Sequence, residues 1–112
     1  MENELVSYVY QRRRLVGAVI ATKIPGSQVV YVTGSLCHRR KDKFTKEQAI
    51  VIAKDRALTM SIHGRPCAVP YSLKNDIAWM AQRAKMYFKG LSVIASPVKK
   101  MEVAEWVGAL LA

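Results

Sequence analysis

Residues 31–60 read YVTGSLCHRRKDKFTKEQAIVIAKDRALTM, and this stretch decides the fold because a strand, a basic loop and a helix follow one another directly. Alternating apolar and polar residues up to position 37 are typical of a strand. The tetrapeptide TKEQ fits a capping box, in which Thr45 and Gln48 each accept a hydrogen bond from the other's backbone amide. Apolar residues then recur at helical spacing, at Ala49, Ile52, Ala53, Ala57 and Met60. The stretch therefore predicts a helix over residues 45–62 with this side facing a sheet.

Two further strands are predicted upstream, at residues 5–10 and 14–23, and they would form a sheet with a strand at residues 28–37. Residues 11–13 between the first two are either a tight turn or a charged stretch of one longer strand. The second strand is almost continuously apolar, which indicates burial on much of both its faces. Alternation places one set of side chains of the third strand together, and we expect it to face the helices: Val30, Val32, Gly34 and Leu36.

Two more helices are predicted downstream, at residues 72–88 with Ser72 as cap, and at residues 97–110, where Ser96 precedes Pro97. Residues 91–95 between them are either a short strand or a strap across the core. These elements predict an α+β fold, a three-stranded antiparallel sheet covered by two or three helices. A length of 112 residues suits a single domain over residues 1–112.

The charge balance concerns partners rather than fold. Lys and Arg number 18 against 8 Asp and Glu, which gives a net charge of +10. Such an excess favours nucleic acid or an acidic protein surface as the partner. No apolar run is long enough for a membrane span, and no secretory signal is visible at the N-terminus. We therefore expect no membrane partner and a cytoplasmic protein with reduced thiols.

The candidate binding site is the basic loop that leads into the first helix. A helix N-terminus carries free amides and a partial positive charge, so loop and helix start together suit phosphate. A second basic group precedes the second strand. The predicted nucleic-acid-binding residues are Arg12, Arg13, Arg14, His38, Arg39, Arg40, Lys41, Lys43 and Lys46. The alternative is that these charged residues form a solvated surface that binds no partner. The positive charge of these residues does not indicate whether the nucleic acid is DNA or RNA.

Cysteine and histidine offer a competing interpretation, since Cys37, His38, His63 and Cys67 could ligate zinc or supply a nucleophile and base. Their spacing fits no standard zinc finger, and adjacent residues at a strand end point to opposite faces. No nucleophile motif, metal-binding carboxylate pair or phosphate-binding glycine loop accompanies them. We therefore expect no metal, no cofactor and no enzymatic activity.

The last predicted helix carries an apolar stripe that includes Trp106, Val107 and Leu110. It could pack on the domain, form a homodimer interface, or enter a groove of a host protein, because Trp-rich stripes often carry binding energy.

The order of hairpin, basic loop and helix resembles the second half of a double-stranded-RNA-binding domain. The similar positions are Lys43, Lys46, Ala49, Ala53 and Ala57. This resemblance implies phosphate contacts from a Lys-rich helix start. The chain departs from it in having no helix before the sheet and two predicted helices after the first. The sheet-then-helix order is also similar to hairpin DNA readers of the integrase and plant-regulator type, which read the groove with strands.

A broader resemblance is to small proteins encoded by bacteriophages. Their core has a strand with Gly, then Cys, then the motif Lys-Asp-x-Phe, and then a helix that contains Arg-Ala. A later helix contains Arg-Ala-x-x-Tyr-Phe. The matching positions are Gly34, Cys37, Lys41-Asp42, Phe44, Arg56-Ala57, Arg83-Ala84 and Tyr87-Phe88. The resemblance implies a viral setting, an infected host cell, and a binding role. Two functions remain open: nucleic-acid binding through the basic loop, or binding and modulation of an acidic host protein.

Overall fold

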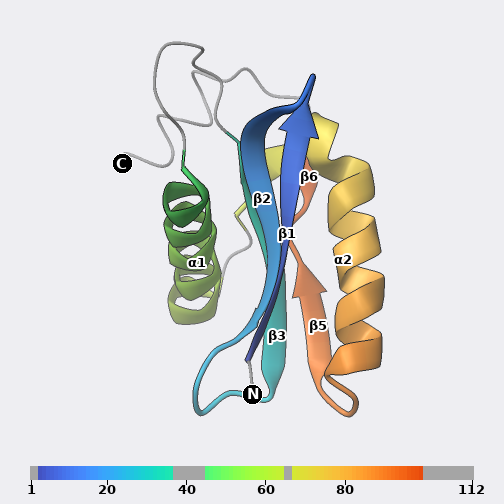
Figure 1. The fold of residues 1–112 in the computed structure, drawn as a ribbon. Coiled ribbons are helices and arrows are strands. Elements are labelled where there is room, and N and C mark those ends of the chain that lie inside the picture. The colour runs from blue at the N-terminus through green and yellow to red at the C-terminus, as the bar shows by residue number, and fades with distance from the viewer. Residues whose placement is uncertain (1–2, 37–44, 65–66, 100–112) are drawn as a thin grey trace.

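The computed structural model describes residues 3–36, 45–64 and 67–99. Its main sheet has four strands in the order β1-β2-β3-β5, of which the first three form an antiparallel meander and the fourth lies parallel to β3 (Figure 1). These strands are β1 (Glu4–Gln11), β2 (Arg14–Lys23), β3 (Val29–Leu36) and β5 (Ser92–Ala95).

The α+β class and the three predicted strands are confirmed, but the prediction of a three-stranded sheet is wrong by one strand. Of the two possibilities left open for residues 91–95, the structure shows the strand. This strand joins the sheet beside β3, with Val29 opposite Ser92 and Val32 opposite Ala95. A parallel neighbour needs a crossover connection, and the chain between β3 and β5 includes both helices.

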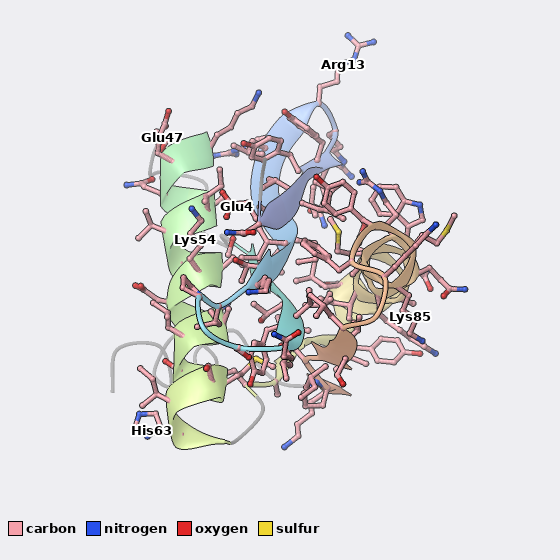
Figure 2. All side chains as sticks on the ribbon, turned by 90° about the horizontal axis from the view of Figure 1, so that it is seen from below. Glu4, Arg13, Glu47, Lys54, His63 and Lys85 are labelled. Carbon is pink, nitrogen blue, oxygen red and sulfur yellow. The ribbon has the colours of Figure 1, made fainter. Side chains whose placement is uncertain are left out.

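The two helices lie on opposite faces of the sheet, α1 (Lys46–His63) on one and α2 (Lys74–Tyr87) on the other (Figure 1). The expectation that both would share the face of Val30 and Val32 is therefore wrong for α1. The physical reason is β2, whose side chains are buried on both faces and need a cover on each side. Figure 2 views α2 nearly end-on while α1 runs across the picture, so the two helices are far from parallel.

The larger apolar cluster lies between the sheet and α2. Its buried members are Val19, Ala21, Val30, Val32, Val69, Leu73, Ile77, Met80, Ala84 and Phe88. On the other side, α1 buries four of the five residues predicted to face the sheet, Ala49, Ala53, Ala57 and Met60, whereas Ile52 is only half-buried. Small side chains allow the helix backbone to approach the sheet closely. Ser35 uses this proximity, because its hydroxyl donates to the Ala49 carbonyl across 2.9 Å.

Both ends of α1 are capped by residues within one turn of the helix. Thr45 Oγ1 accepts from the Gln48 amide and Gln48 Oε1 accepts from the Thr45 amide, each at 3.1 Å, so the capping box is confirmed. Gly64 ends the helix in the left-handed conformation (φ 64°), and its amide donates to the Met60 carbonyl.

The start of α2 differs from its prediction. A 3-10 turn, η1 (Tyr71–Leu73), runs directly into α2, so Ser72 lies inside the turn and does not cap the helix. Pro70 sets the backbone for this turn with φ −60°.

The third predicted helix is wrong at its start. Residues 98–99 form a short strand, β6 (Val98–Lys99), which pairs in parallel with β4 (Val69–Pro70). Ser96, the predicted cap, is buried and donates instead to Thr33 Oγ1 across 2.7 Å. The remainder of that predicted helix, and the dimer interface predicted on it, lie outside the described residues.

Candidate nucleic-acid interface

Arg12 and Arg13 form the complete turn between β1 and β2, since Gln11 and Arg14 are the last residues that pair. Both have positive φ, 51° and 66°. Two-residue hairpin turns with two positive φ values are of type I′, which favours Asn-Gly because most side chains cost ~1–2 kcal/mol per residue in this conformation. Of the two possibilities left open for residues 11–13, the structure shows the tight turn. It holds two strained arginines where most hairpins place Asn and Gly.

The strained turn presents its charge to solvent. Arg12 and Arg13 are both exposed, and Arg14, the first residue of β2, is exposed beside them. Figure 2 shows the Arg13 side chain extending away from the tip of the hairpin. A register shift between Val9 and Tyr10, just below the tip, adds local twist to this end of the hairpin.

Lys46, the described member of the predicted loop-and-helix site, lies toward the same end of the sheet. Its ammonium lies 4.9 Å from the centroid of the Tyr8 ring, a cation–π contact between the first residue of α1 and β1. Tyr8 precedes Gln11 by three residues, so it stands about 10 Å along the strand from the turn. Both views show the hairpin tip and the start of α1 toward the same end of the molecule (Figures 1 and 2).

The first turn of α1 adds backbone donors to this end. The first backbone hydrogen bond within the helix runs from the Ala49 amide to the Thr45 carbonyl, so the amides of Lys46 and Glu47 precede the helical ladder. Glu47 is exposed in the same turn and offsets part of the positive potential there. Among the described residues of the hairpin tip and the first turn of α1, three arginines and one lysine outnumber one carboxylate, so the balance of charge there favours an anion.

The remaining predicted site residues, His38, Arg39, Arg40, Lys41 and Lys43, lie outside the described residues. The residues that flank them are described. Leu36 pairs with Gly17, which also pairs with Val9, so β3 ends at a level three residues before Arg12 on β1 and four residues after Arg13 on β2. Both flanks of the predicted basic loop, Leu36 and Thr45, therefore lie at the end of the sheet where the turn and Lys46 gather.

Two other basic residues of α1 serve the fold. Lys54 Nζ lies 3.1 Å from Glu4 Oε2, which ties the helix to β1. Arg56 is only 6% exposed, and its Nη1 donates to the Gly34 carbonyl across 2.6 Å. Burial lowers the pKa of Arg56 to about 10, partly opposed by the nearby Cys67 thiol. Sequence reasoning did not single out Arg56 as buried, because arginine seldom is.

The histidine and cysteine that the structure describes do not form a ligand set. Cys67 Sγ lies 3.8 Å from the Arg56 carbonyl, while His63 is exposed in the last turn of α1. Within residues 3–36, 45–64 and 67–99, no three His, Cys, Asp or Glu side chains are grouped so that they could hold a metal ion. Across the same residues, no helix combines the length and the apolar character that crossing a membrane requires.

Comparison with known proteins identifies no family for this chain. No protein-family model, curated protein or solved structure matches the chain.

Proposed function

We propose that the protein binds nucleic acid, without catalysing a reaction on it, through backbone phosphates held at one end of the sheet. This basic end consists of Arg12, Arg13, Arg14 and Lys46. The observation that carries the proposal is the type I′ turn, in which two exposed arginines occupy left-handed positions that Asn and Gly would occupy at lower cost. Strain of this kind concentrates at functional sites, where a side chain is needed for more than the fold.

Arginine suits this role because its guanidinium forms bidentate hydrogen bonds with phosphate oxygens. Contacts of this type position a protein on nucleic acid but read no base, so we expect weak sequence selectivity. Each phosphate contact releases counterions and makes affinity fall with salt, with a slope of about −0.9 per contact on a double-logarithmic plot. Three contacts would give a slope of about −2.7, and affinity would fall about 40-fold between 50 and 200 mM salt.

The test is binding of the purified, nuclease-treated protein to labelled DNA and RNA, as duplexes and single strands, across a salt series. The decisive variant is Arg12→Asn/Arg13→Gly, which removes two charges and supplies the preferred turn residues, so lost binding cannot be attributed to a damaged hairpin. We expect it to weaken binding and to reduce the salt slope by about 2.

The matched control removes two positive charges at the other end of the molecule, as Lys23→Gln/Lys89→Gln. Lys23 ends β2 at the turn before β3, and Lys89 follows α2, both at the end opposite the arginine turn (Figure 1). If the control and the turn variant lose affinity equally, net charge alone causes binding and the proposed site is wrong.

A second function, binding and modulation of a host protein, is favoured by a different observation. The solvent side of α1 carries three exposed apolar residues at helical spacing, Val51, Leu58 and Ile62. Such a stripe is a common feature of helices that meet a protein partner. The resemblance to phage-encoded proteins suits this function as well. Absence of nucleic-acid binding at moderate salt, together with stoichiometric capture of one host protein after nuclease treatment, would favour it.

A further inference from the structure

Two aromatic rings, one on η1 and one on α2, are about half-exposed to solvent. Trp79 is 50% exposed, whereas Ile77 and Met80 beside it on the helix are buried against the sheet. The Arg83 guanidinium, one turn further along, lies 4.9 Å from the centroid of the Trp79 ring. Tryptophan is usually well buried, so a half-exposed ring accompanied by a guanidinium indicates a binding surface.

A second pair of the same kind lies where η1 joins α2. Tyr71 is 47% exposed, and the Lys74 ammonium lies 5.2 Å from its ring centroid and donates to its hydroxyl across 3.3 Å. Eight residues separate Tyr71 from Trp79, which corresponds to about 12 Å along a helix. That distance spans about three nucleotides at ~3.4 Å per nucleotide of a stacked strand.

The charge around these rings matches a polyanion. Residues 71–85 contain three basic residues, Lys74, Arg83 and Lys85, against the single acid Asp76. Aromatic rings interleaved with basic side chains are the combination with which proteins bind single strands, because bases stack on the rings while cations contact the backbone. A duplex keeps its bases stacked internally and offers such rings only its sugar-phosphate edge.

The aromatic face continues from the basic end. η1 and the start of α2 lie at the same end of the sheet as the Arg12–Arg13 turn (Figure 1), and α2 then runs from there toward the opposite end. A strand held by its phosphates at the turn could therefore continue along Tyr71 and Trp79.

We propose that the outer face of η1 and α2 is a stacking platform for unpaired bases, so that the preferred ligand is single-stranded nucleic acid. Tyr71 and Trp79 stack the bases, while Lys74 and Arg83 contact the flanking phosphates. This inference rests on the proposed nucleic-acid binding and names its substrate class.

The test compares a labelled single strand of about 12 nucleotides, the same strand with abasic sugars at its central positions, and the matching duplex. Wild type should bind the intact strand more tightly than either alternative. Trp79→Leu should weaken binding of the intact strand about 5- to 160-fold, the range expected for one lost base stack, and leave duplex binding unchanged. Ile62→Ala, which truncates an exposed apolar side chain on α1, is the control and should change neither.

A fluorescence measurement keeps the test independent of affinity. Trp106→Phe leaves Trp79 as the only tryptophan of the chain, so its emission reports stacking directly. The intact strand should quench this emission, and the abasic strand and poly-glutamate should not. Equal quenching by poly-glutamate would overturn the proposal, because it would show that charge suffices and that an acidic protein segment fits the same surface.

Failure of this inference and failure of the proposed function give different results. If Trp79→Leu binds all three ligands like wild type while Arg12→Asn/Arg13→Gly loses binding, the platform is wrong and the phosphate site stands. If wild type binds none of the three, both proposals fall.

Discussion

Arg56 Nη1 donates to the carbonyl oxygen of Gly34 across 2.6 Å, and this contact fastens the middle of α1 to the end of β3. The side chain is buried among the small residues that bring the helix close to the sheet. A buried, charge-assisted hydrogen bond is strong when intact and costly when one partner is lost. Arg56 therefore belongs to the scaffold that sets the direction of α1 and with it the position of Lys46.

The first prediction concerns the stability that Arg56 supplies. Arg56→Ala should lower the free energy of unfolding by about 2–4 kcal/mol, because it leaves a cavity and deprives the Gly34 carbonyl of a donor. Urea denaturation would measure this loss. Arg83→Ala, which removes an exposed arginine of α2, should stay within about 0.5 kcal/mol of wild type. An equal effect of the two substitutions would contradict the scaffold role.

The second prediction concerns the pH dependence of the same residue. Burial lowers its folded pKa to about 10, below the ordinary value of an arginine in the unfolded chain. Between these values the unfolded chain binds more protons than the folded one, so the contribution of Arg56 to the free energy of unfolding rises with pH in that window. Below it both states are protonated and the contribution is constant. The stability difference between wild type and Arg56→Met should therefore be flat from pH 7 to 9 and shift in favour of wild type by pH 11.

The third prediction separates stability from binding at the arginine turn. Arg12→Asn/Arg13→Gly should raise the free energy of unfolding by about 1–2 kcal/mol, because it relieves left-handed strain, with part of the gain offset by the freedom of glycine in the unfolded chain. Thermal unfolding followed by circular dichroism would measure the gain. A lower melting temperature than wild type would show that the arginines stabilise the turn and would remove the strain argument for function.

The fourth prediction concerns Gly17, where the backbone of β3 approaches β2 too closely for a side chain. A Cβ at this position would lie 2.1 Å from the Ser35 carbonyl oxygen, so neighbouring backbone would have to move. Gly17→Ala should destabilise the protein by at least about 2 kcal/mol. Gly26→Ala is the useful comparison, since a Cβ there meets nothing within 4 Å and only its positive φ opposes the change, at a cost of about 1 kcal/mol.

Local signals in the sequence were sufficient for much of the fold. The capping box at Thr45 and the glycine at position 64 define α1 because capping depends on residues within one turn of each other. The hairpins formed by β1, β2 and β3 follow from alternation and short turns. The basic groups at the turn and at Lys46 were identified as separate charges, and only the register and the Tyr8 contact bring them together.

The errors arose where contacts join residues far apart in the chain. β5 is four residues long and pairs in parallel with β3, from which both helices separate it in the sequence. No hairpin turn therefore indicates this pairing. Ser96 has the local pattern of a helix cap, yet its hydroxyl donates to Thr33, 63 positions earlier. The placement of α1 and α2 on opposite faces likewise depends on β2, which is covered on both sides. The apolar composition of β2 indicates that both its faces are buried. The periodicity of a helix shows which side of it packs on a sheet, but not which face of the sheet it covers.

The last prediction concerns that long-range contact between Ser96 and Thr33. Both side chains are buried, and the Ser96 amide also donates to the Val32 carbonyl, so residue 96 fastens the end of β5 to β3. Ser96→Ala should cost about 1–3 kcal/mol, because the Thr33 hydroxyl keeps its desolvation and loses its donor. Thr33→Val/Ser96→Ala removes both hydroxyls and should cost less than the two single changes added together. A double-mutant cycle in urea measures this coupling. Additive single effects would mean that the hydroxyls act independently, and that the backbone pairing of β5 alone holds the fourth strand in place.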